Sequence, residues 1–113
     1  MLNSELLDEF CDALWLEEGL ARNTLESYRR DLDKFAEWLE RMHGRGLLAA
    51  GYADIQDFLA HLVGVEKARA TSTSRAISSL KRLYRYLLRQ NRIAVDPTLQ
   101  IATPKLPRSL PKS

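Results

Sequence analysis

Apolar residues in this chain recur at steps of three and four, and this spacing restricts the possible folds more than any other feature. The longest run consists of Leu25, Tyr28, Leu32, Phe35, Leu39 and Met42. Such spacing places the side chains on one face of an α-helix. No segment shows the sustained alternation of polar and apolar residues that is typical of a half-buried strand. The sequence therefore predicts an all-α protein.

Four segments show the helical pattern, and the first two have clear end signals. The first helix begins near Ser4 and is expected to end before Gly19, which suits a left-handed C-terminal cap. The second is expected to start after Asn23 as N-cap, with Glu26 completing a variant of the capping box. Two glycines within residues 43–46 should end this helix.

The third and fourth helices follow the glycine-containing loop. The third is expected from about Asp54 to Gly64. The fourth should follow the hydroxyl-rich run at residues 71–74, any member of which suits a cap, and extend to about Asn91. Its expected core stripe is Ile77, Leu80, Leu83, Tyr84, Leu87 and Leu88. The sequence thus predicts a bundle of four helices.

Length and composition indicate one domain and a tail. The 113 residues are 45% hydrophobic, which is enough for one core and too little chain for two. We expect residues 1–96 to form the domain. Residues 97–113, which are basic and contain all four prolines, should form an extended linker. The sequence lacks a long apolar run and a secretory signal at its start, so we expect a cytoplasmic protein without membrane contact.

Charge is strongly segregated along the chain. Residues 67–95 contain eight Lys or Arg and no Asp or Glu, although the net charge of the whole chain is only +2. Residues 1–66 carry six basic and fourteen acidic residues, whereas residues 67–113 carry eleven basic residues and one acid. This distribution indicates a surface that faces a polyanion.

Five arginines of the fourth helix should share the face opposite its core stripe. They are Arg75, Arg82, Arg85, Arg89 and Arg92. Because this face lacks acidic residues, we expect the arginines to repel one another unless an anionic partner compensates them. A basic face of this kind is typical of nucleic-acid binding, although a merely solvated basic face is the alternative.

The start of the second helix offers similar chemistry. Arg22, Asn23, Thr24 and Ser27 group side-chain donors with the free N–H groups of a helix N-terminus, an arrangement that binds phosphate. Ser72, Thr73 and Ser74 do the same before the fourth helix. Further along the second helix, Arg30 and Arg41 are basic, but i,i+4 pairs with Glu26 and Glu37 would explain them without DNA.

Enzymatic and metal chemistry lack support within the chain. The two histidines and the single Cys11 have no metal-ligand spacing, and no cofactor-binding motif is present. Tyr84 and Tyr86 lie among arginines, as a phosphate-attacking tyrosine would. However, Tyr84 belongs to the core stripe and Tyr86 has no base beside it, so we expect both to be packing or contact residues.

Three motifs resemble the N-terminal domain of Xer-type tyrosine recombinases. They are GLARNTLESYRRDL at residues 19–32, SRAISSLKRLYRYLL at residues 74–88, and DPT at residues 96–98 with the proline-containing tail that follows. The resemblance spans almost the whole chain. It implies a SAM-like core-binding bundle that forms, with a C-terminal catalytic domain, a clamp around a duplex recombination half-site. One departure is Tyr52, where relatives often carry a small polar residue.

The resemblance also implies the function and the partners. The expected function is site-specific recombination in chromosome dimer resolution and segregation, with duplex DNA and further recombinase protomers of a synaptic complex as partners. The catalytic residues of the family belong to the second domain, so we expect this chain alone to bind DNA as a monomer without being an enzyme. An alternative is a helical protein–protein interaction module that docks an acidic partner.

The residues that we expect to contact DNA come from the second and fourth helices. They are Arg22, Asn23, Thr24, Ser27, Arg30, Ser72, Thr73, Ser74, Arg75, Ser79, Arg82, Arg85 and Arg89.

Overall fold

The computed structural model of the chain describes residues 3–102 and contains four α-helices. These are α1 (Asn3–Glu18), α2 (Arg22–His43), α3 (Tyr52–Gly64) and α4 (Ala70–Arg89), with a short 3-10 helix, η1 (Leu47–Ala49), before α3. No strand occurs among these hundred residues. The prediction of an all-α fold with four helices is therefore confirmed.

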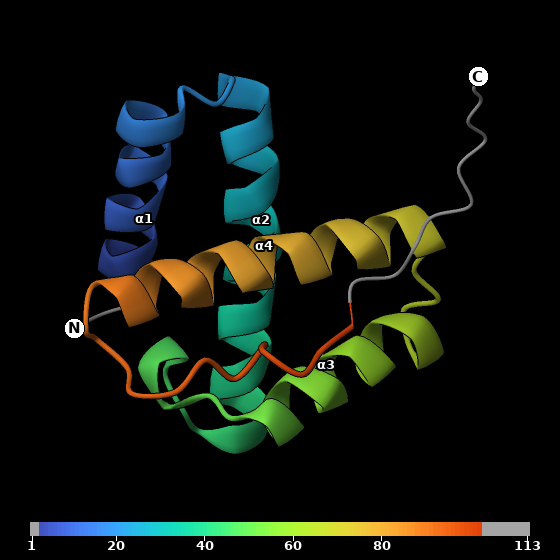
Figure 1. Ribbon diagram of the computed structural model, residues 1–113. Coiled ribbons are helices and arrows are strands. Elements are labelled where there is room, and N and C mark those ends of the chain that lie inside the picture. Colours follow the sequence, from blue (N-terminus) through green and yellow to red (C-terminus); the bar gives the residue numbers. More distant parts are fainter. Residues whose placement is uncertain (1–2, 103–113) are drawn as a thin grey trace.

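Helix α2 lies at the centre of the arrangement and contacts the three other helices. Figure 1 shows α1 and α2 side by side and antiparallel, joined by a tight connection, with α4 crossing both of them. Helix α3 lies near the C-terminal half of α2 and also contacts α4. This arrangement places the N-terminal half of α2 next to α4, and these are the two elements expected to bind DNA.

The core is built from the predicted apolar stripes. Phe10, Leu32, Phe35, Ile55 and Leu83 are among the residues that are almost completely buried. Burial of each such side chain stabilises the fold by roughly 1.5–3 kcal/mol. The aromatic rings of Phe35 and Phe58 meet edge to face, with their centroids 5.0 Å apart. The four helices therefore pack around one continuous core.

Two members of the expected stripes are exposed instead. Met42 retains 60% of its accessible surface and Leu88 retains 39%. Both residues lie in the last turn of a helix, α2 and α4 respectively. The apolar pattern of the sequence therefore extends one turn beyond the part of each helix that the neighbouring helices cover.

Glycines end the first two helices, as predicted. Gly19 follows α1 and Gly44 follows α2, with φ angles of +62° and +64°. The Gly44 N–H donates to the carbonyl oxygen of Glu40 at 2.9 Å. A left-handed residue closes a helix in this way without the steric cost that a Cβ atom would add.

The helix starts differ from the prediction. Helix α2 begins at Arg22 after an extended Ala21, and no side chain caps it. Helix α4 likewise begins at Ala70 after Arg69, so the hydroxyl-rich residues 71–74 lie inside its first turns. The predicted cap at Asn23, and the predicted caps among residues 71–74, are therefore wrong. Backbone hydrogen bonds of the helices form before these side chains are reached.

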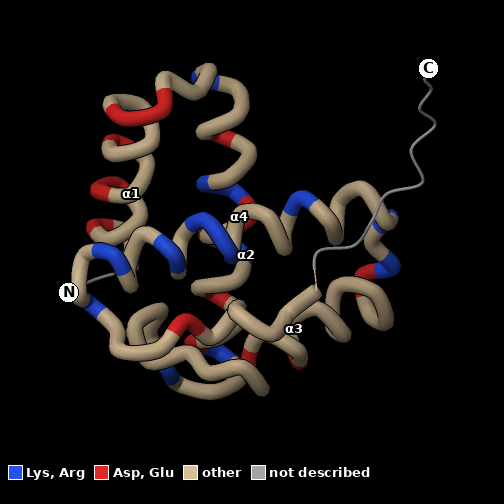
Figure 2. Tube along the Cα trace, in the orientation of Figure 1, with Lys and Arg blue, Asp and Glu red and all other residues tan. Residues whose placement is uncertain are grey.

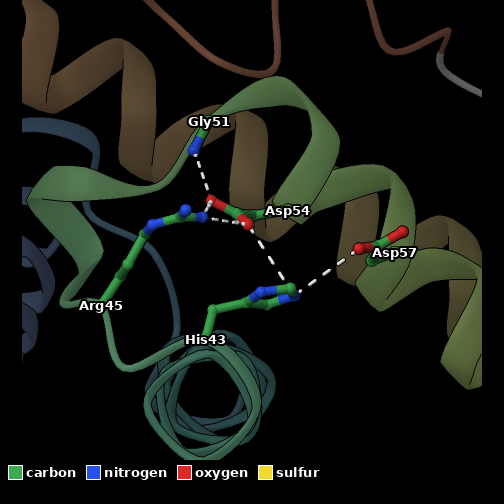
Figure 3. A network of polar contacts seen from close by, with 5 residues as sticks. All are labelled: His43, Arg45, Gly51, Asp54 and Asp57. Carbon is green, nitrogen blue, oxygen red and sulfur yellow. Dashed lines mark hydrogen bonds and ion pairs between the residues drawn. The ribbon is translucent and has the colours of Figure 1, made fainter.

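A buried carboxylate organises the start of α3 (Figure 3). Asp54, only 3% exposed, accepts a hydrogen bond from the Gly51 N–H at 2.8 Å. It also accepts two contacts from Arg45 Nη1, at 2.7 and 2.8 Å. His43 Nε2 lies 3.8 Å from Asp54 and 3.5 Å from Asp57. This network ties the segment after α2 to α3, which begins at Tyr52, two residues earlier than expected.

The 3-10 helix η1 is held by two residues that lie far from it in the sequence, one before it and one after it. The Leu47 N–H donates to Asn3 Oδ1 at 3.1 Å, and the Leu47 carbonyl accepts a bond from the Tyr84 hydroxyl at 2.8 Å. Tyr84 is fully buried, as the core stripe predicts. Burial raises the pKa of Tyr84 far above its ordinary value, so its hydroxyl remains a donor.

The segment after α4 packs against the helices. Pro97 and Thr98 are buried, and Lys81 Nζ donates to the Thr98 carbonyl at 2.8 Å. The Asp96 carboxylate accepts bonds from the Thr98 N–H and hydroxyl at 2.8 and 2.6 Å. Pro97, Thr98 and Ile101, from the first part of the expected linker, therefore pack against the helices. Residues 103–113 lie outside the described part of the chain.

Candidate nucleic-acid interface

The arginines of α4 occupy one exposed side of the helix. Figure 2 shows basic residues spaced along α4 and acidic residues along α1. Arg75, Arg85 and Arg89 are exposed, and Arg82 is half-buried. The sequence therefore predicted correctly that these side chains avoid the core.

Acids from α1 and α2 neutralise most of this face. Four salt bridges follow one another along α4 and the turn after it. They join Arg75 to Asp31 (2.9 Å), Arg82 to Glu18 (2.5 Å), Arg89 to Glu17 (3.2 Å) and Arg92 to Glu9 (2.7 Å). We call these four pairs the ion-pair seam. The expectation of mutually repelling, uncompensated arginines is wrong, because charges that are segregated in sequence meet in the fold.

The pairs of the seam remain charged but are exchangeable. The hydrogen bond to Asp31 raises the pKa of Arg75, and the hydrogen bond to Glu18 raises the pKa of Arg82. Solvent-exposed ion pairs contribute only about 0–1 kcal/mol each to stability. A phosphate oxygen can therefore replace the exposed carboxylates of Glu18 and Glu17 as partners of Arg82 and Arg89 at small cost, whereas Asp31, the partner of Arg75, is nearly buried.

Six cationic side chains in residues 3–102 have neither an ion pair nor a hydrogen bond. They are Arg22, Arg30, Arg41, Lys67, Arg69 and Arg85. The alternative interpretation of α2, in which Glu26 pairs with Arg30 and Glu37 with Arg41, is not observed. The i,i+4 pair that does form on this helix joins Arg29 Nε to Asp33 at 3.2 Å. Arg30 and Arg85 thus remain available to an external anion.

The two expected groups of contact residues lie on α2 and α4, two helices that contact each other. In α2, Arg22, Asn23 and Arg30 are exposed, whereas Thr24 and Ser27 are half-buried. All five lie in the first three turns of α2, whereas Figure 1 shows α4 crossing this helix near its middle.

Tyr28 and Asp31 join these two groups. The Arg82 guanidinium lies 5.7 Å from the centre of the Tyr28 ring. Asp31 lies one residue beyond Arg30 and pairs with Arg75. Sequence reasoning assigned no contact role to either residue. Their position in the sequence could have predicted these contacts, since both residues lie on the side of α2 that carries the apolar stripe and therefore faces the other helices.

The hydroxyl residues of α4 are less accessible than expected. Ser72 and Thr73 are half-buried, and Ser74 and Ser79 are buried. The Ser79 hydroxyl lies 2.9 Å from the Arg75 carbonyl and 3.3 Å from Asp31 Oδ2. The Ser79 hydroxyl therefore has hydrogen-bond partners within the protein. The hydroxyls of Thr73 and Ser74 are buried without a partner.

Other kinds of site receive no support from the described residues. Between residues 3 and 102, no three His, Cys, Asp or Glu side chains are grouped as metal ligands would be. None of the helices in that range combines the length and the apolar character needed to cross a membrane. Tyr86 is half-buried, with its ring centre 5.5 Å from that of Phe10, as a packing residue would be.

A four-helix domain with arginines exposed on α2 and α4 agrees with a known family. The profile of the phage integrase N-terminal SAM-like domain matches residues 7–91, and the chain belongs to this family.

Among curated proteins, the chain is similar to enzymes named tyrosine recombinase XerD. It is 49% identical to that of Pseudomonas aeruginosa over 114 residues, 44% to that of Yersinia pestis over 110, and 46% to that of Pseudomonas putida over 112. These alignments cover 99%, 97% and 99% of the chain, but only 37%, 36% and 37% of the relatives. The chain thus spans little more than a third of their length.

These relatives confirm the resemblance to Xer-type recombinases. The pattern of the basic, proline-containing tail predicts the XerD branch of that family, with the XerC branch second. All three relatives above carry the name XerD. Most of the tail lies outside the described residues, so the agreement concerns sequence alone.

Proposed function

We propose that this chain is the DNA-binding domain of a site-specific tyrosine recombinase of the Xer type. The observation that carries the proposal is the joint surface of α2 and α4 in a member of this domain family. On it, Arg85 has no internal partner, and Arg82 and Arg89 have exposed acidic partners that a phosphate oxygen can replace. Such a surface suits the phosphate backbone of duplex DNA.

The proposed contacts have different tasks. The guanidinium groups of Arg85, Arg89 and Arg30 bind phosphate oxygens, and the N-terminus of α2 adds free N–H groups near Arg22 and Asn23. These contacts set affinity and orientation without reading sequence. Base edges in the major groove are then reached from the N-terminal half of α4.

The remaining parts of the function belong to the longer protein. Strand breakage and rejoining would be carried out by a catalytic domain beyond this chain, which by itself is proposed to be a monomer and not an enzyme. Further recombinase protomers would complete a synaptic complex in chromosome dimer resolution and segregation, in the cytoplasm. We propose that the domain extends to residue 102, because Pro97 and Thr98 pack on it. Residues 103–113 would then form the linker.

Salt dependence of duplex binding tests the proposal. If the surface neutralises about four phosphates, log K should fall with log salt with a slope near −3.6. Arg85→Ala should reduce the magnitude of this slope by about 0.9, because it removes one phosphate contact without breaking an ion pair. Fluorescence anisotropy of a labelled duplex between 50 and 300 mM salt (roughly the range where counterion release dominates) provides the measurement.

Arg41→Ala is the matched control. Arg41 is exposed and has no ion pair, but it lies eleven residues beyond Arg30, about 16 Å further along α2. This variant has the same net charge as Arg85→Ala and should keep the wild-type slope. A slope near zero for the wild type would refute DNA binding and favour the alternative, a module that docks an acidic protein.

A further inference from the structure

The pair of Arg75 and Asp31 has a geometry that the pairs of Arg82 and Arg89 lack. Arg75 donates from Nε to Asp31 Oδ2 at 2.9 Å and from Nη2 to Asp31 Oδ1 at 3.1 Å. Two nitrogens therefore face two oxygens in a planar fork. In the pairs of Arg82 and Arg89, one nitrogen contacts one oxygen. A fork restricts rotation of the guanidinium in a way that a single contact does not.

Asp31 is itself held in place. Its side chain is only 12% exposed, whereas Glu18 is 41% and Glu17 is 54% exposed. The hydroxyl of the buried Ser79 lies 3.3 Å from Asp31 Oδ2, on the side of the carboxylate that also faces Arg75. The anchor of Arg75 is thus a nearly buried group on α2 and not a mobile surface side chain.

The fork leaves a specific set of donors unused. A guanidinium carries five N–H groups, and Asp31 accepts those on Nε and on one side of Nη2. Both N–H groups of Nη1 and the second N–H of Nη2 have no partner in residues 3–102. These form the end of the guanidinium, which matches the adjacent O6 and N7 acceptors of guanine in the major groove.

The neighbours of Arg75 on the helix surface are small. Arg75 is the sixth residue of α4, with Thr71 and Ser72 one turn before it and Ser78 and Ser79 one turn after it. None of these side chains extends beyond the arginine. This part of α4 can therefore approach base edges closely.

We infer that Arg75 recognises a guanine in the major groove and that Asp31 is the positioning residue that holds its guanidinium for this contact. The inference rests on the proposed function, since it requires duplex DNA as the partner. It distinguishes Arg75 from the other arginines of α4, which bind phosphate.

Selection from a pool of randomised duplexes by the full chain tests the inference. The wild type should enrich guanine at one position of the bound site. Arg75→Lys, which keeps the charge but loses the fork, should reduce that preference by roughly 5- to 150-fold while the salt slope stays unchanged. Asp31→Asn should reduce the same preference without weakening binding to the unselected pool. Glu18→Gln is the matched control, because it removes the partner of Arg82 and should leave the base preference intact.

The possible outcomes separate the two proposals. Failure of the wild type to bind any duplex overturns the proposed function and this inference with it. Duplex binding with a guanine preference that survives both Arg75→Lys and Asp31→Asn overturns the inference alone. If Asp31→Asn instead strengthened binding equally to all duplex sequences, Asp31 would act only as a competitor of phosphate for Arg75, and this result would also overturn the inference. Circular dichroism monitors the folding of each variant. If Asp31→Asn loses helicity, the guanine preference of Arg75→Lys alone tests the inference.

Discussion

Replacement of Asp54 by alanine should destabilise the domain through one well-defined network. The substitution removes the acceptor of the Gly51 N–H (2.8 Å) and the partner of Arg45 (2.7 Å). The backbone bond contributes about 1 kcal/mol. The bond to Arg45 contributes about another 1 kcal/mol, because that side chain is 48% exposed and water compensates part of its loss. We therefore expect a loss of about 2 kcal/mol in the free energy of unfolding, or roughly 8–16 °C in Tm.

Urea unfolding, followed by circular dichroism and by tryptophan fluorescence, measures this loss. Trp38 is a suitable probe, because it is 5% exposed and its ring centre lies 5.3 Å from that of His43. Asp57→Ala is the matched control, since this acid also lies in α3 near His43 but has a side chain that is 59% exposed. We expect the control to change stability by less than about 0.5 kcal/mol.

Two further variants divide the loss into its parts. Asp54→Asn keeps an oxygen for the Gly51 N–H and should lose only about half as much stability as Asp54→Ala. Arg45→Ala combined with Asp54→Ala should be less destabilised than the sum of the single variants, because both remove the same bond. Equal stability of Asp54→Ala and Asp57→Ala would refute the argument that the buried carboxylate anchors α3.

Two other predictions concern stability. Tyr84→Phe should cost about 1–2 kcal/mol in urea unfolding, because it leaves the buried Leu47 carbonyl without its donor at 2.8 Å; wild-type stability of this variant would contradict the assignment. The hydrogen bond from Lys34, with that from His61, lowers the pKa of Glu66 below its ordinary value of 4.5. This contribution to stability is fully present above pH 4.5 and is lost as the pH falls through the lowered pKa, so Glu66→Gln should show a flatter loss of stability on acidification than the wild type.

The helices and their ends were predictable where the signal is local. The stripe from Leu25 to Leu39 defines α2, and Gly19 and Gly44 end helices because a left-handed backbone suits glycine. Helix starts were less predictable. Several polar residues in a row satisfy the rules for a cap, and the residues that precede α2 and α4, Ala21 and Arg69, carry no capping signal.

The charge of the candidate site could not be predicted from the sequence pattern. Arg75 and Arg82 lie 44 and 64 residues from their acidic partners, and no periodicity relates groups that far apart. The 3-10 helix at Leu47 was missed for the same reason, because its contacts come from Asn3 and Tyr84. Exposure of the arginines follows from helix geometry, but their pairing follows from which helices the fold places side by side.

The ion-pair seam also determines how the chain appears to nucleic acid while it is being synthesised. A ribosome delivers residues 1–66 first, and this part carries fourteen acidic and only six basic residues. Helices α1 and α2 therefore emerge as a polyacid, which nucleic acids repel. The arginines that pair with Asp31, Glu18 and Glu17 arrive 44 to 72 residues after their partners. The acids that neutralise Arg75, Arg82 and Arg89 are thus already present when these arginines are synthesised, and the pairs form as α4 docks.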